Sequence, residues 1–268
     1  MPIIQGGVVI EDGLPRPLDP FGRVRHATPT STLQSVVTAA NAGDVIYCDA
    51  GAYDETVTVN KRLSIVGLGG RGGAYIEPST VGAEGMQVTA DDVTLINLGV
   101  AGEATASYAL NLNACARFRG YSCKFEGPDG TVVLVDGTAT DQVGDALLDD
   151  CEFAWGGSGI LFDDSAYGYP TQVFLQRSRF HNLTAVHVGL AAGGGVANLH
   201  LIDCIHDNLE DGTAPTDYIK VDRAGDTGII SGCRFATPTN DAALLTIAAG
   251  ILWVANATEA GWSLARPA

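Results

Sequence analysis

Short apolar runs recur along the chain, and each one ends at Gly, Asp, Asn or Pro. Most are only a few residues long, which is typical of β-strands and too short for helices. Because two or three runs fall in each repeat, the pattern predicts an all-β chain. The clearest runs are Thr131–Val135, Ala146–Phe153, Gly159–Phe162, Gln172–Leu175, Ala185–Val188, Ala197–Ile202, Tyr218–Val221, Thr227–Ile230 and Leu244–Ile247.

A second pattern is a cysteine followed two residues later by phenylalanine, at a nearly constant spacing. We call the first position the Cys slot. Serine or leucine takes it in some repeats, and His206 replaces phenylalanine in one. The slot residues are Leu68, Leu98, Cys123, Cys151, Ser178, Cys204 and Cys233, with Phe125, Phe153, Phe180 and Phe235 two residues further on. The slots recur about every 27 residues, a period too short for paired-helix repeats, and the consensus of a leucine-rich repeat is absent.

Short strands at this period predict a single-stranded right-handed parallel β-helix of about seven to eight coils over residues 31–250. Equivalent residues of successive coils would lie about 4.8 Å apart and form ladders. Residues i and i+2 share a strand face, so the Cys slot and the following phenylalanine both point inward. We expect all six cysteines, including Cys48 and Cys115, to be buried free thiols, since no zinc-type spacing is present.

The ends of such a stack need caps. Residues 32–42 carry Leu33, Val36 and Val37 at helical spacing, which predicts a short N-terminal capping helix with Ser31 or Thr32 at its N-cap. The preceding residues 1–30 contain five prolines and are expected to form an extended arm. Its basic residues Arg16, Arg23 and Arg25 are candidates for binding a partner, and residues 251–268 form a C-terminal cap or tail.

The chain is strongly acidic, with 31 Asp and Glu against 15 Lys and Arg among 268 residues and a net charge of −16. An acidic surface repels nucleic acids and anionic membranes, so neither is an expected partner. No apolar run is long enough for a membrane-spanning helix, and the first residues lack the features of a signal peptide. Synthesis and folding in a cytoplasm, where thiols stay reduced, are therefore expected.

The segment from Thr32 to Gly69 resembles the opening coil of the pectin lyase-like superfamily, especially pectin methylesterases. The matching residues are Thr32-Leu33-Gln34, Ala39-Ala40, Gly43-Asp44-Val45-Ile46, Gly51-Ala52-Tyr53-Asp54-Glu55, Val57-Thr58-Val59 and Leu63-Ser64-Ile65-Val66-Gly67-Leu68-Gly69. The resemblance is confined to this segment and implies the β-helix fold, with Tyr53 packed inward and Glu55 accepting backbone donors. The methylesterase motifs Asp-Phe-Ile-Phe-Gly and Leu-Gly-Arg-Pro-Trp are missing, and Gln142 and Asp145 are the nearest candidates. The resemblance therefore implies a catalytically degenerate relative.

Other glycan-cleaving β-helices remain as alternatives. A hydrolase needs two nearby carboxyls, which Asp149–Asp150 or Asp163–Asp164 offer, and Asp150 could approach Arg177 and Asp203. A lyase would need an acidic cluster with a base, for which Asp203, Asp207 and Arg179 are candidates. Adjacent aspartates on β-coils are more often turn residues, which is the interpretation we favour. His181, His187, His200 and His206 are expected to be turn or groove residues.

The function expected from these features is that of a non-enzymatic structural protein of a tailed-phage particle: a capsid decoration, spike or fibre component. It would be located in the virion, anchored to a capsid or other virion protein through its arm or an end face. A homotrimer is expected, with no cofactor and no metal. The alternatives are a carbohydrate-binding or polysaccharide-depolymerising β-helix and a bacterial surface protein. Trp155, Tyr167 and Tyr169 are candidates for glycan or subunit contacts.

Overall fold

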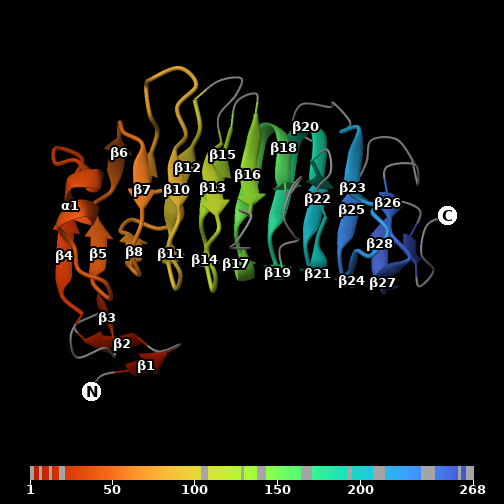
Figure 1. Cartoon of the computed structure of the whole chain (residues 1–268), viewed down its shortest axis with the longest axis horizontal. Coiled ribbons are helices and arrows are strands. Elements are labelled where there is room, and N and C mark those ends of the chain that lie inside the picture. The colour runs from red at the N-terminus through yellow and green to blue at the C-terminus, as the bar shows by residue number, and fades with distance from the viewer. Residues whose placement is uncertain are drawn as a thin grey trace.

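The computed structural model describes residues 3–5, 8–11, 14–17, 22–103, 108–127, 130–137, 143–163, 171–191, 195–207, 215–236, 245–258 and 261–263. The coils stack along one long axis, with the N-terminal coils at one end and the C-terminal coils at the other (Figure 1). Strands of neighbouring coils pair in parallel from β4 (Val24–Ala27) onwards. The chain is the right-handed parallel β-helix that the repeat predicts.

One wall of the β-helix is a ten-stranded parallel sheet, which we call the first wall. It contains β4, β5 (Val45–Cys48), β8 (Ser64–Gly67), β11 (Thr94–Ile96), β14 (Arg119–Tyr121), β17 (Gly144–Asp149), β19 (Thr171–Gln176), β21 (Ala197–Ile202), β24 (Thr227–Ser231) and β27 (Gly250–Val254).

The remaining strands of the coils form a 16-stranded sheet that bends into two further walls. The second wall contains β6 (Gly51–Tyr53), β9 (Ala74–Ile76), β12 (Leu98–Ala101), β15 (Lys124–Glu126), the first parts of β18 (Glu152–Asp163) and β20 (Arg179–Leu190), β22 (Ile205–Asp207), β25 (Arg234–Ala236) and β28 (Asn256–Thr258). The third wall contains β7 (Val57–Val59), β10 (Met86–Val88), β13 (Leu110–Asn113), β16 (Thr131–Asp136), the last parts of β18 and β20, β23 (Asp217–Val221) and β26 (Leu245–Ile247).

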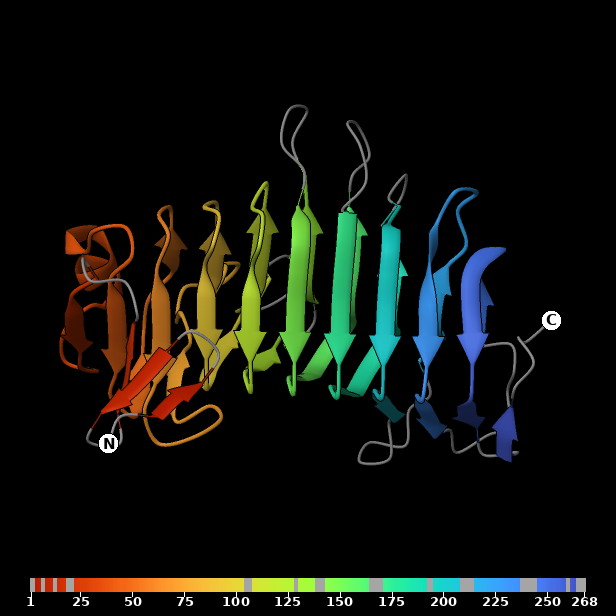
Figure 2. The same cartoon turned by 90° about the horizontal axis from the view of Figure 1, so that it is seen from below.

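Within the described part of the chain, six coils have three separate strands, beginning at β5, β8, β11, β14, β21 and β24. In two central coils the second and third strands run together as the 12-residue strands β18 and β20 (Figure 2). Merging removes a break between the two walls and makes the middle of the stack its most continuous part.

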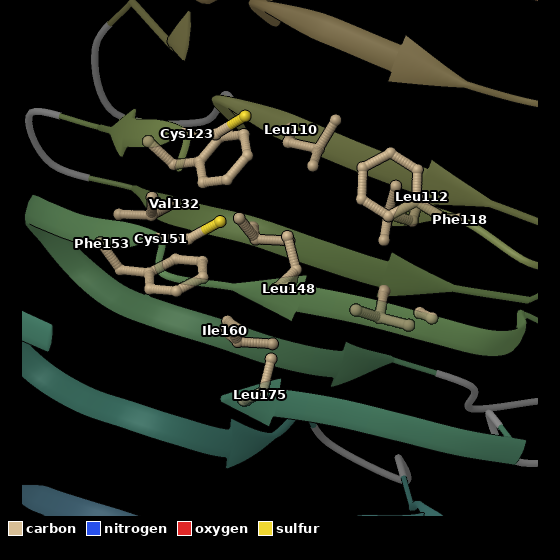
Figure 3. Close-up of a cluster of buried hydrophobic side chains, with 14 of the residues drawn as sticks. Leu110, Leu112, Phe118, Cys123, Val132, Leu148, Cys151, Phe153, Ile160 and Leu175 are labelled. Carbon is tan, nitrogen blue, oxygen red and sulfur yellow. The ribbon is translucent and has the colours of Figure 1, made fainter. Parts of the chain in front are cut away.

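The Cys slot is an inward ladder, as predicted. Strand register places Leu98, Cys123, Cys151, Ser178, Cys204 and Cys233 in one column, and all are at most 1% exposed. Figure 3 shows Cys123 and Cys151 one above the other beside Phe153. All six cysteines are free and buried. Ser178 is accommodated because its hydroxyl donates to the Gln176 carbonyl at 2.8 Å and accepts the Cys151 N–H at 3.1 Å.

Leu68 does not belong to this ladder. The strand pairing aligns Ala74 with Leu98, and Leu68 instead lies partly buried on the outer side against Val66. The glycine-rich segment between residues 67 and 73 inserts a loop before β9, which shifts the register of this coil. Counting from Leu68 therefore overestimates the number of residues in that coil.

A residue with positive φ comes directly before most of the slot residues. It is Asn97, Ser122, Asp150, Arg177, Asp203, Gly232 or Ala255, with φ between 47° and 67°. This left-handed conformation turns the chain sharply from the first wall into the second. Asp150, Arg177 and Asp203 therefore occupy the same turn in successive coils, and the turn role favoured for the paired aspartates is correct for Asp150.

Helix α1 (Leu33–Ala39) caps the N-terminal end, with Leu33 and Val37 buried. The residue at its N-cap is Thr32, but its side chain makes no capping hydrogen bond. Glu55 does this instead: its carboxylate accepts the N–H groups of Leu33 and of Gln34, the latter at 2.8 Å. Tyr53 is 2% exposed and its hydroxyl lies 3.0 Å from the carbonyls of Ala27 and Asp49. Glu55 and Tyr53 thus fix the cap to the first coil.

The N-terminal segment differs from the extended arm expected of residues 1–30. Strands β1 (Ile3–Gln5), β2 (Val8–Glu11) and β3 (Leu14–Pro17) form a separate antiparallel sheet, which lies beside the first coils (Figure 1). Strand β4 is already the first strand of the β-helix. Buried Asp44 holds it: the carboxylate accepts the Arg23 N–H at 2.9 Å, the Asn41 N–H at 2.9 Å and Arg25 Nε at 2.6 Å. Burial raises the pKa of Asp44, but these donors outweigh it and the pKa is lowered overall.

At the C-terminal end a polar residue takes the Cys slot. Asn256 is fully buried; its side chain accepts the Cys233 N–H at 2.9 Å and donates to the Ile230 carbonyl at 2.9 Å. Beyond it the chain reverses, and β28 pairs antiparallel with β29 (Gly261–Ser263). In the part of the chain that the structure describes, no helix is long and apolar enough to span a membrane.

Candidate functional site

The outer face of the second wall carries a strip of opposite charges, which we call the charged strip. On each strand the residues on either side of the inward phenylalanine point outward. The strip consists of Tyr75, Lys124, Glu126, Glu152, Arg179, His181 and Asp207, joined by Arg71 from the loop before β9. The alternation of acids and bases on adjacent strands brings opposite charges side by side.

Each acid of the charged strip has a basic or phenolic partner. Lys124 Nζ lies 2.7 Å from Glu126, whose carboxylate also accepts the Tyr75 hydroxyl. Arg179 donates to both carboxylate oxygens of Asp207, each at 3.2 Å. Arg71 binds Asp150 at 2.6 Å. Lys124 and Glu126 pair within one strand, whereas the other contacts join different coils, so the charges of the strip are balanced and its coils are linked.

His181 and Glu152 form the most buried pair of the strip. Nε2 of His181 lies 3.0 Å from Glu152, and the histidine side chain is only 4% exposed. The hydrogen bond to His181 lowers the pKa of Glu152, and the nearby Lys124 and Arg71 lower it further. A general acid for glycoside cleavage needs a raised pKa, so Glu152 is suited to ion pairing rather than proton donation.

The outer face of the first wall is different, because its C-terminal half is apolar. Strand register aligns one outward residue from each of β17, β19, β21, β24 and β27. We call this ladder the apolar stripe; its members are Leu147, Phe174, His200, Ile229 and Leu252. Leu252 is 59% exposed, and the other four are partly buried. The rings of Phe174 and His200 stack with centroids 4.4 Å apart.

The N-terminal half of the same outer face is mixed, and only part of it is buried. Val45, Tyr47 and Val66 are 5%, 3% and 6% exposed and form a small cluster with Leu68 and Ile96, whereas Val24 is 53% exposed. Val45 lies in the row of the apolar stripe, and Tyr47, Val66 and Ile96 lie in the row beside it. Between Val45 and Leu147 the row of the stripe is interrupted by Ser64, Thr94 and Arg119.

Two histidines lie in the interior, which corrects the turn or groove location expected for them. His187 and His206 are both 0% exposed. His206 occupies the phenylalanine position of its coil, stacked between Phe180 and Phe235 with centroids 4.8 and 4.7 Å away. Complete burial lowers the pKa of His206 to about 3, so this ring is neutral. The position was visible in the sequence, since His206 stands two residues after Cys204.

The other candidate residues are dispersed. Trp155 lies on β18 and is 47% exposed. Asp163 lies beside Asp136 on the adjacent third-wall strand. Asp149 pairs with Arg177 across the first-wall turn, and Asp203 is a turn residue with positive φ. Within the described segments no three His, Cys, Asp or Glu residues converge as a metal site. Tyr167, Tyr169, Asp164 and Gln142 lie outside the described residues, and of Arg16 only the backbone is described.

Comparison with known proteins by sequence gives no match, neither to a family model nor to a curated protein. Comparison by structure gives three informative likenesses. Pectin methylesterase from Aspergillus niger superposes with a TM-score of 0.62 and 14% identity, covering 90% of this chain and 85% of that enzyme. Geobacillus virus E2 ORF18 has a TM-score of 0.59 and 12% identity, covering 86% of this chain. Tailspike protein gp49 of Acinetobacter baumannii bacteriophage Fri1, a capsular polysaccharide depolymerase, has a TM-score of 0.56 and 12% identity, covering 94%.

These likenesses show the fold. The chain spans about 59% and 58% of the length of the two virus proteins and most of the length of the methylesterase. At 12 to 14% identity the shared feature is the path of the backbone, and function depends on the site that each chain builds upon it.

Proposed function

We propose, from the premise that this chain has the pectin lyase-like parallel β-helix fold, that it is a structural component of a tailed-phage particle. In this role it is a rigid spike, fibre or capsid-decoration element attached through its N-terminal end. The observation that carries the proposal is the charged strip, where each acid is tied to a base on its own or a neighbouring coil. Such pairing suits a surface that stiffens the stack.

The N-terminal end supports attachment at that point. The sheet β1–β3 is additional to the coils, and the Asp44 contacts join the following strand firmly to the β-helix. An additional sheet at one end of the rigid β-helix is a suitable place for attachment to a particle. The likeness to two virus proteins is in keeping with this role, although it rests on fold alone.

The test is to locate the protein in particles purified from cells that carry its gene. Mass spectrometry of the particles and immunogold electron microscopy with an antibody to this chain should find it in many copies at a fixed site. Deletion of residues 1–21 should leave the β-helix folded but absent from the particles. Particles that lack the full-length chain would contradict the proposal.

A second candidate is polysaccharide depolymerisation, favoured by one observation. Asp136 and Asp163 are register partners on adjacent third-wall strands, which places two carboxylate side chains on neighbouring positions of one face, and glycoside hydrolysis needs two nearby carboxyls. Cleavage of capsular or pectic polysaccharide by the purified protein, lost in Asp163→Asn and retained in the charged-strip variant Glu152→Gln, would favour this candidate over the structural one.

A further inference from the structure

The apolar stripe is a regular surface feature that the charged strip does not explain. Leu147, Phe174, His200, Ile229 and Leu252 lie on five successive strands of a flat parallel sheet. At about 4.8 Å for each strand the stripe is about 19 Å long. Contiguous apolar surface on a protein commonly marks an interaction site.

The distribution of charge on the chain limits which partners can bind at the apolar stripe. The chain carries a net charge of −16, so most of its surface repels a second copy. The stripe itself contains no acid. In the row on one side of it the acid is Asp149, which forms an ion pair with Arg177; the row continues with Gln176, Ile202, Ser231 and Val254. On the other side the acid is Asp145, also on β17. Two copies can therefore meet along the stripe itself without bringing carboxylates together, and the acids that flank it lie only at its β17 end.

The N-terminal half of the same sheet face contrasts with the stripe. There the row of the stripe continues through Arg119, Thr94 and Ser64, which interrupt its apolar character. In the C-terminal half the row contains no acid, Lys or Arg, and Leu252 and, in the row beside it, Val254 are 59% and 38% exposed. The apolar part of the row is thus confined to the C-terminal half and is most exposed at its end.

The interval between the residues of the apolar stripe indicates which partner fits it. A partner that packs into every gap of the ladder must present side chains at the same interval of about 4.8 Å along a straight line. A second copy of this chain does so by construction when the two long axes are parallel. We propose that the apolar stripe is a self-association surface, which packs against the same stripe of further copies of this chain side by side.

The surface goes beyond the proposed structural role, since it requires no particle. Two copies would pair about a two-fold axis parallel to the stack, and three, the number expected from the sequence, about a three-fold axis. Analytical ultracentrifugation of the purified full chain should give two or three times the chain mass. The variant Phe174→Glu should give the mass of one chain, because it places a charge in the middle of the stripe.

Matched variants separate this surface from a general effect of added charge. Ile205→Glu makes the same kind of change at a 40% exposed apolar residue on the second wall, and it should keep the assembled mass. Leu252→Glu, at the most exposed stripe position, should shift the mass towards one chain with little risk to folding; circular dichroism and thermal unfolding of each variant verify the fold. A wild-type chain that sediments as a monomer, or assemblies unaffected by both stripe variants, would overturn the proposal. Binding of a glycan by a monomeric wild type, lost in Phe174→Glu, would instead assign the stripe to a saccharide ligand.

Discussion

The molecule contains the same aromatic pair twice, once inside the β-helix and once outside. Phe180 and His206 stack in the interior with centroids 4.8 Å apart and planes 4° apart. Phe174 and His200 stack on the outer face of the first wall at 4.4 Å and 15°. In both cases the two rings come from adjacent coils at equivalent positions.

The difference between the pairs lies in what surrounds them. The inner pair is part of a column in which Phe125, Phe153, Phe180, His206, Phe235 and Trp253 follow one another with centroids 4.5 to 5.6 Å apart. Phe180 is fully buried, whereas Phe174 keeps part of its surface in water. A ladder pointing inward stabilises the fold, and a ladder pointing outward provides a surface for another molecule.

Truncating the two phenylalanines should separate these roles most clearly. Phe180→Ala leaves a cavity in the column and should lower the free energy of unfolding by about 4 kcal/mol. Phe174→Ala removes a partly buried ring and should cost about 1 kcal/mol in the monomer. Urea unfolding of both variants, followed by circular dichroism at low protein concentration, measures the two losses. Equal losses would mean that the outer ring is as much part of the core as the inner one.

Acid should destabilise the protein more through His206 than through His200, and the loss in the free energy of unfolding should be smaller than that caused by Phe180→Ala. His206 has its pKa lowered to about 3 by burial, against an ordinary value of 6.5, so the unfolded chain binds a proton that the folded chain excludes. Stability is therefore highest above pH 6.5 and falls as the pH decreases towards 3. Linkage gives a loss of about 2.5 kcal/mol between pH 6 and pH 4 from this group.

Replacement of each histidine by phenylalanine provides the comparison. His206→Phe should remove most of that pH dependence. His200→Phe should alter it less, because the pKa of His200 is lowered only by partial burial. Unfolding curves between pH 4 and pH 7 measure both effects. An unchanged slope in His206→Phe would show that the inner ring is accessible to protons in the folded state.

The Cys slot should give the smallest effect. Cys204→Ser can use the arrangement of Ser178, whose hydroxyl donates to the carbonyl two residues before it, so we expect a loss of only about 1 kcal/mol. In the native wild type none of the six buried thiols should react rapidly with a disulfide reagent, and all should react after unfolding. Rapid native reaction of a slot thiol would show that the column opens locally.

The repeat in the sequence predicted the interior well because each inward position is constrained by the coils on both sides. Cys151 and Phe153 must match the shape of their neighbours, so their residue types recur at the coil period. The prediction that Leu68 occupies the Cys slot was wrong because a glycine-rich loop changes the length of one coil, and the pattern of apolar residues does not reveal this change. His206 was placed in the right slot, but residue type alone suggested a polar location.

The outer surfaces were harder to predict, since outward residues have no common requirement from one coil to the next. His181 lies opposite Ala154 in the register of β18 and β20, so its pairing with Glu152 is diagonal, and a one-residue difference in register would separate them. The apolar stripe consists of five different side chains, which no single-residue repeat reveals. Its alignment follows only when the pairing of β17 with β19 and of β19 with β21 is known.

The antiparallel pairing of β28 with β29 has a consequence for how long such a structure can become. A parallel β-helix is in effect a one-dimensional polymer, in which every finished coil offers unpaired backbone groups as a template for another coil or another chain. Because β29 lies beyond β28 and pairs with it, β29 occupies part of that template at the C-terminal end. Growth from this end is thereby restrained, and sideways association can occur without end-to-end fibre formation.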